Sequence, residues 1–164
     1  MIELRPSSPQ DAERVLQIWR EAVAATHGFL KPADRDDLEA LVRDVVSQAP
    51  LTLAVDQGGR PLAFMLLDGA HMEALFVDPL HSGAGLGRRL VEHALAAHDV
   101  ITTDVNEQNH QAMRFYLRMG FSAFGRSETD GQGRAYPLIH LRRGSSALSA
   151  QYCNPLWSGD ATRP

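Results

Sequence analysis

The stretch Leu75-Phe-Val-Asp-Pro-Leu-His-Ser-Gly-Ala-Gly-Leu-Gly-Arg-Arg89 decides the fold of this chain. An apolar run ends at Asp78-Pro79, three alternating glycines follow, and a helical pattern of apolar residues begins at Leu86. This order predicts a strand, a glycine-rich turn and a helix N-terminus, where amide N–H groups lack intrahelical partners. Glycines let an anion approach the backbone without meeting a Cβ atom, and the helix dipole attracts negative charge. We therefore predict a turn that binds phosphate.

Composition narrows the class of protein. The chain has 164 residues, is 44% hydrophobic and carries a formal charge of −4 from 16 basic and 20 acidic residues. This indicates one domain with a hydrophobic core, and it argues against a nucleic-acid partner because nucleic-acid-binding proteins usually have a basic excess. No apolar stretch approaches the roughly 20 residues that span a bilayer. With one cysteine, Cys153, and no signal-peptide pattern, we expect a cytoplasmic protein without a membrane partner.

Hydrophobic periodicity and turn residues predict the order of elements along the chain. The predicted strands are residues 2–5, 51–55, 61–67, 71–77, 100–105, 121–129 and 134–141. Predicted helices follow Ser8, run from 34 to 48, run from 86 to about 98, and follow Asn109 as far as Gly120. The order β-α-α-β-β-β-α-β-α-β-β is that of an α/β protein with a mixed sheet. We expect a domain over 1–143 and a mobile tail over 144–164.

Two common phosphate-binding motifs do not fit the glycine turn. A P-loop needs Lys followed by Ser or Thr after its second glycine, but Gly87 is followed by Arg88-Arg89. A dinucleotide fingerprint needs a third glycine where Arg88 stands, and it lies near the first strand rather than the fourth. The histidines show no metal-ligand spacing, so no metal is expected.

The turn and a second motif together carry a family resemblance. Gly83-Ala84-Gly85-Leu86-Gly87-Arg88 follows Phe76-Val77-Asp78-Pro79, and Asn109-x-x-Ala112-x-x-Phe115-Tyr116-x-x-x-Gly120-Phe121 comes later. Over about residues 1–143 the chain resembles the GNAT N-acetyltransferase superfamily, and in particular a small bacterial branch of it. The resemblance implies a GNAT-like mixed, mostly antiparallel sheet flanked by helices. It also implies acetyl-CoA as cofactor and direct transfer of the acetyl group to an amine in a ternary complex.

The resemblance further implies which residues contact acetyl-CoA. The pyrophosphate would lie on the turn, the pantetheine amides would pair with the backbone of the preceding strand, and the second motif would reach the pantetheine arm. These residues are Leu75, Phe76, Val77, Ser82, Gly83, Ala84, Gly85, Leu86, Gly87, Arg88, Asn109 and Phe115. One position departs from the family pattern, because Ser82 stands where a long Gln or Arg is usual. We expect the backbone amides to bind the pyrophosphate all the same, with Arg88 supplying charge.

Acetyl transfer needs a base for the amine and an acid for the departing thiolate. Tyr116 matches the tyrosine that is the general acid in many family members, and a phenol is mostly protonated at neutral pH. His71, Glu73, Leu75 and Val77 alternate, so we expect them to share one strand face. His71 and Glu73 are then the candidate bases, whereas His27, between the first two helices, is predicted to be a loop residue.

The sequence leaves open the functional class, the acceptor and the oligomeric state. A non-catalytic CoA-binding or regulatory module is the rival to an enzyme, suggested by Ser82, and a nucleic-acid-directed acetyltransferase is a weaker third. The acceptor is a small-molecule amine or an amine of a protein or peptide, because the fold alone does not fix the substrate. The sequence also leaves the oligomeric state open, a homodimer included.

Overall fold

The computed structural model describes residues 1–144, which fall into two compact units. The first unit is Met1–His93 and the second begins at Ala94. No helix of the described residues is long and apolar enough to cross a membrane. The predicted tail lies outside the described residues except for Gly144, which is the last residue of a strand.

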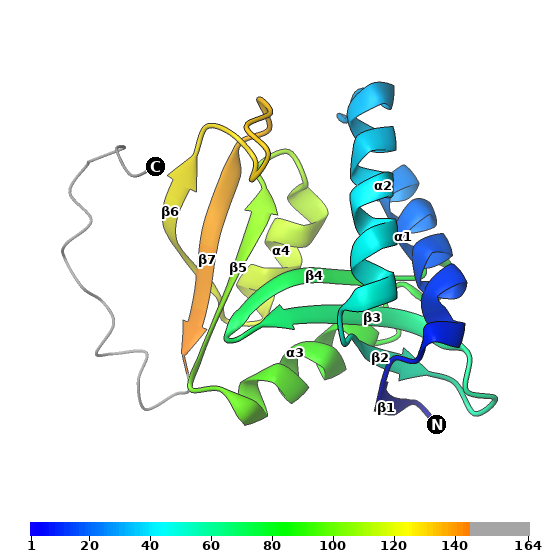
Figure 1. Ribbon diagram of the computed structural model, residues 1–164. Helices are drawn as coiled ribbons and strands as arrows, with labels where there is room; N and C mark the ends of the chain where they lie inside the picture. The colour runs from blue at the N-terminus through cyan, green and yellow to red at the C-terminus, as the bar shows by residue number, and fades with distance from the viewer. Residues whose placement is uncertain (145–164) are drawn as a thin grey trace. The chain divides into compact units, whose positions relative to one another are not determined.

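The first unit contains four strands in the order β1-β2-β3-β4, with every neighbouring pair antiparallel. Two helices separate the first strand from the other three, and a helix begins at the end of the unit (Figure 1). The elements are β1 (Glu3–Pro6), α1 (Ala12–Thr26), α2 (Pro32–Gln48), β2 (Thr52–Val55), β3 (Pro61–Asp68), β4 (His71–Val77) and the start of α3 (Leu86–Ala97).

Helix α1 packs on this sheet because its apolar residues recur at helical spacing. Figure 1 shows α2 beside α1, and α1 contacts α2, β3 and β4. The core between helices and strands consists of Val15, Leu16, Ile18, Trp19, Val23, Val46, Leu51, Leu53, Val55 and Phe64. From β4, Ala74 and Phe76 pack against this cluster, so one face of β4 is turned toward the helices.

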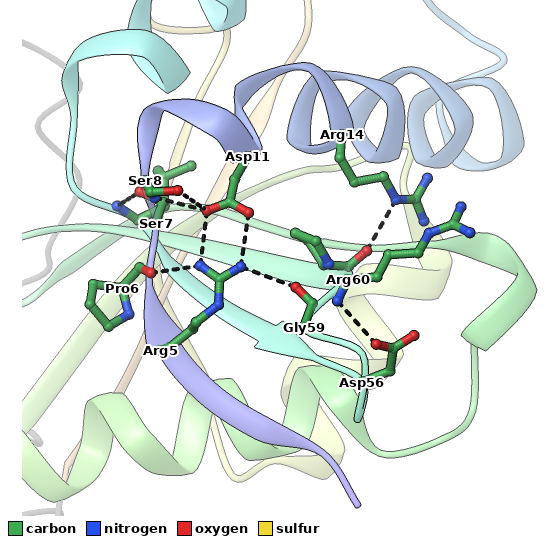
Figure 2. Close-up of polar contacts among 11 residues, drawn as sticks. Arg5, Pro6, Ser7, Ser8, Asp11, Arg14, Asp56, Gly59 and Arg60 are labelled. Carbon is green, nitrogen blue, oxygen red and sulfur yellow. Dashed lines mark hydrogen bonds and ion pairs between the residues drawn. The ribbon is translucent and has the colours of Figure 1, made fainter.

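A polar network fixes the chain between β1 and α1 (Figure 2). The Arg5 guanidinium donates to both carboxylate oxygens of Asp11 at 2.9 and 2.8 Å, and to the Gly59 carbonyl at 3.1 Å. The Ser8 N–H donates to Asp11 at 2.8 Å, so this carboxylate also caps the short 3-10 helix Pro9–Asp11. The hydrogen bond from Arg5 holds the pKa of Asp11 far below its usual range, although burial opposes this.

The second unit contains three antiparallel strands in the order β5-β7-β6. Its elements are the end of α3, β5 (Val100–Asn106), α4 (His110–Arg118), β6 (Ser122–Ser127) and β7 (Leu138–Gly144). Ile101, Thr103 and Val105 alternate as buried residues of β5 with exposed or half-buried ones, which gives the strand a core face and an outer face.

The predicted α/β class and the order of strands and helices are confirmed. The strand predicted over 134–141 begins instead at Leu138. The preceding segment is a loop in which the Arg134 N–H donates to the Asp130 side chain at 2.8 Å, and Pro137 has no N–H to offer a ladder. Helix α2 begins at Pro32 rather than Asp34, because proline suits the first helical turn.

Candidate functional site

The glycine turn between β4 and α3 has the conformation that an anion-binding turn requires. Gly83 and Gly85 have φ of 80° and 79°, a left-handed conformation that other residues rarely adopt. The first helical hydrogen bond described for α3 runs from the Arg89 N–H to the Gly85 carbonyl at 3.1 Å. The amides of Leu86, Gly87 and Arg88 therefore lie in the first turn, where the helix itself supplies no acceptor.

The backbone of the glycine turn is open to an approaching ligand. A Cβ atom added at Gly83 or Gly85 would meet nothing within 4 Å, so the backbone can be approached closely there. Residues 82–85 are exposed, whereas Leu86 is buried and anchors the start of α3. The Arg88 side chain is exposed and donates to Glu92 at 2.7 Å, so its charge is shared with a neighbouring carboxylate.

Asp78 holds the turn in place, a role that the sequence analysis did not assign. Its carboxylate accepts from the Leu80 N–H at 2.9 Å and forms an ion pair with Arg14 of α1. The side chain of Asp78 is 2% exposed. Burial acts to raise the pKa of Asp78, but the bonds from Leu80 and Arg14 outweigh it and the pKa is lowered. The sequence signal that points to this role of Asp78 is an Asp-Pro pair directly after an apolar strand.

A β-bulge in β4 overturns the predicted shared face of His71, Glu73, Leu75 and Val77. Leu66 pairs with Ala74, but the next residue, Leu67, pairs with Met72, so Glu73 is an extra residue. Directly paired residues lie on the same face, and each shift by one residue exchanges the faces. His71 therefore lies on the face of Ala74 and Phe76, toward α1, while Leu75 and Val77 lie on the other face.

His71 and Glu73 are nevertheless neighbours. The His71 Nε2 atom lies 4.0 Å from Glu73 Oε1, with side chains 30% and 50% exposed. The imidazole has an acid beside it and access to solvent. This pair can exchange protons with a bound molecule directly or through water.

His27 is a half-buried, neutral group in the loop that follows α1. Its ring lies 5.3 Å from that of Phe29 and 6.4 Å from that of Phe76 on β4. Burial lowers the pKa of His27 to about 4. The Thr26 hydroxyl donates to the Ala22 carbonyl at 2.7 Å, so it accepts from His27 Nδ1, also at 2.7 Å. The Nε2 atom consequently carries the lone pair.

Tyr116 is buried on α4 in the second unit. Its ring makes edge-to-face contacts with Phe115 and Phe121, at centroid distances of 5.0 and 5.2 Å. Burial raises the pKa of Tyr116 well above its usual value, and a hydrogen bond with Thr103 opposes this only in part. The phenol is therefore protonated throughout the physiological range and is a proton donor rather than a base.

Asn109 caps α4, as the sequence predicts. Its side-chain oxygen accepts from the Ala112 N–H at 3.1 Å. The residue is buried, and the cap leaves its amide NH₂ group for other acceptors. Within the first unit the His71–Glu73 pair lies at the start of β4 and the glycine turn follows its end; within the second, Phe115 and Tyr116 lie on α4, which Asn109 caps.

Comparison with known proteins assigns the family. The sequence model of the GNAT acetyltransferase domain family matches residues 18–136, which is more than half of the chain. The chain belongs to the GNAT family, and it is an N-acetyltransferase. The prediction of an enzyme is confirmed, and a non-catalytic module is not retained.

Individual relatives agree over nearly their whole lengths. The chain is 51% identical over 141 residues to the peptidyl-lysine N-acetyltransferase YjaB of Salmonella typhimurium, covering 86% of this chain and 97% of that protein. It matches the solution structure of apo YjaB from Escherichia coli with a TM-score of 0.84 and 48% identity, over 88% of this chain and 99% of that one. The fold also matches yncA of Salmonella typhimurium, solved with acetyl-CoA, with a TM-score of 0.60 and 21% identity over 88% and 94%.

Proposed function

We propose that the chain transfers the acetyl group of acetyl-CoA to the ε-amine of lysine residues in peptides or proteins. The observation that carries the proposal is the 51% identity, over 97% of its length, to a relative named as a peptidyl-lysine N-acetyltransferase. We also propose a cytoplasmic location, which the single cysteine of the sequence supports.

The residues that hold acetyl-CoA are, in this proposal, those of the glycine turn and its surroundings. The backbone amides of 82–88 bind the pyrophosphate, the backbone of 75–77 pairs with the pantetheine amides, and Asn109 and Phe115 contact the pantetheine arm. The left-handed glycines and the open space beside them support this assignment. When bound, acetyl-CoA supplies an activated acetyl group as a thioester.

The proton transfers are assigned to three side chains. Tyr116 gives its proton to the departing thiolate, which its raised pKa supports because the phenol is protonated at neutral pH. His71, with Glu73 beside it, removes a proton from the lysine ammonium directly or through water. An amine attacks only in its neutral form, so the base is needed before transfer.

The experiment is an acetyl-CoA turnover assay on a peptide with one lysine and a blocked N-terminus. The matched control peptide has arginine in place of lysine, and mass spectrometry follows the product. The enzyme itself contains only one lysine, Lys31, so acetylation of its own ε-amines contributes little background. Turnover of a polyamine with none of the lysine peptide would overturn the proposed acceptor.

A further inference from the structure

Three side chains on neighbouring strands of the second unit form a continuous hydrogen-bonded chain. The Ser127 hydroxyl on β6 lies 2.6 Å from His140 Nε2 on β7. The other ring nitrogen, Nδ1, lies 2.5 Å from the Asp104 carboxylate on β5. A serine, a histidine and an aspartate thus meet in series, with the histidine on the central strand.

The hydrogen-bond inventory fixes the direction of this chain. A carboxylate only accepts, so the His140 Nδ1–H donates to Asp104. In the neutral imidazole Nε2 then carries the lone pair and accepts from the Ser127 hydroxyl. This is the tautomer and the order of donors by which Ser-His-Asp triads activate a serine, an arrangement recognised by geometry rather than by sequence position.

Strand register explains how the three residues share one face. Asp104 pairs directly with His140, and Ser127 pairs with Leu138, two residues along β7. A bulge at Phe124 precedes Ser127, because Ala123 pairs with Leu141 but Gly125 pairs with His140. With regular alternation along β6, Ser127 would share the face of Ala123, which is opposite to that of His140. The bulge therefore brings the Ser127 hydroxyl to the face of the imidazole.

The trio is separate from the Tyr116 side of the sheet and is open to solvent. Thr103, which hydrogen-bonds Tyr116, precedes Asp104 and therefore points to the other face of β5. The side chains of Asp104 and His140 are 36% and 24% exposed. The Phe124 ring lies 6.1 Å from that of His140, and the Arg142 guanidinium lies over the same ring at 5.5 Å from its centroid, so an aromatic ring and a positive charge adjoin the reactive group.

We propose that Ser127 is a nucleophile that takes the acyl group of small esters, with His140 as its general base and Asp104 as a positioning residue. The Ser127 Oγ atom forms a bond to the ester carbonyl carbon, and its proton passes to His140 Nε2. The bond from that carbon to the alcohol oxygen breaks, and the leaving alkoxide either takes the proton from His140 or departs as an anion, in which case His140 releases the proton to solvent. Water then hydrolyses the acyl-serine by the same proton path, releasing a carboxylic acid.

The test uses p-nitrophenyl acetate with the full chain in the absence of CoA. We expect a burst of p-nitrophenolate and one acetyl group that peptide mapping locates on Ser127. His140→Gln should slow this acylation by about 100-fold or more, and Asp104→Asn by roughly tenfold or more, with unchanged Tm. Ser127→Cys should retain acylation, because it keeps a nucleophile at the same position.

The matched control is Ser122→Ala, which removes another serine of β6 and should leave the burst unchanged. Mapping also separates Ser127 from the other reactive groups, since the sequence holds one lysine, Lys31, and one cysteine, Cys153. Absence of acetyl-Ser127 in the unaltered chain would overturn the proposal without reference to any variant. An acylation rate that is the same in His140→Gln would overturn the assigned base.

Discussion

At the scale of single residues, Asp78 connects the glycine turn to the body of the first unit. Its carboxylate pairs with Arg14 while both side chains are largely buried, with 2% and 13% exposed. A buried charge that loses its partner costs far more free energy than an exposed one. Asp78 caps the 3-10 helix Pro79–His81, which leads directly into the glycine turn, so the position of the turn depends on this ion pair.

Asp78→Asn should therefore lower the free energy of unfolding by about 2 to 4 kcal/mol and weaken acetyl-CoA binding. Asparagine can still accept from the Leu80 N–H, so the change removes the charge that faces Arg14 and, at 3.5 Å, His81 Nδ1. Urea unfolding and calorimetric titration measure the two effects. Glu92→Gln is the matched control, because the Arg88–Glu92 pair is exposed and should cost no more than about 0.5 kcal/mol. Equal losses in the two variants would contradict this account.

Tyr116 offers a second prediction at this scale. Tyr116→Phe keeps the ring that packs against Phe115 and Phe121 but removes the proton donor, so kcat should fall by about 100-fold or more with little change in KM for acetyl-CoA. Steady-state kinetics on the lysine peptide measures both constants. Tyr136→Phe, which alters another buried tyrosine, should change kcat no more than a few-fold. A Tyr116→Phe enzyme of full activity would exclude the proposed acid.

At the scale of elements, the sequence predicts those features whose signals lie within a few neighbouring residues. Apolar periodicity and the Asn109 cap predict α4, and β-branched residues predict β5, because these signals act within a few residues. The bulges at Glu73 and Phe124 depend on which residue lies opposite in the neighbouring strand. Simple alternation of residues along a strand therefore predicts the wrong face for His71, and it does not predict that Ser127 meets His140.

The turn before α3 is an element whose conformation can be tested directly. Gly85 has φ of 79°, and a Cβ atom there would meet nothing within 4 Å. Gly85→Ala should cost about 1 to 2 kcal/mol of stability from backbone conformation alone, and its methyl group would point into the space proposed for pyrophosphate. Acetyl-CoA affinity should fall at least as much as stability.

Gly28→Ala provides the control for that change. This residue also has open space around it, but its φ is not positive, so alanine should be tolerated within about 0.5 kcal/mol. Thermal unfolding with and without acetyl-CoA compares the two variants. If Gly85→Ala bound acetyl-CoA with unchanged affinity, the proposed position of the pyrophosphate would be wrong.

At the scale of the whole molecule, groups whose pKa differs between the folded and the unfolded chain determine how stability depends on pH. His27 has a pKa of about 4 when folded, because burial disfavours the imidazolium, against about 6.5 in an unfolded chain. The unfolded chain therefore binds the proton first as pH falls. The contribution of His27 is complete above about pH 6.5 and decreases as pH falls toward about 4.

The last prediction is that His27→Gln removes this dependence. Glutamine cannot be protonated, so between pH 6.5 and 4 the variant should lose about 1 to 3 kcal/mol less unfolding free energy than the unaltered protein. Urea unfolding at a series of pH values measures the difference. Asp11 and Asp78 have lowered pKa values, and their contributions decrease mainly below about pH 4 in both proteins, so the comparison cancels them. Parallel profiles for His27→Gln and the unaltered protein would show that His27 is not the group that titrates.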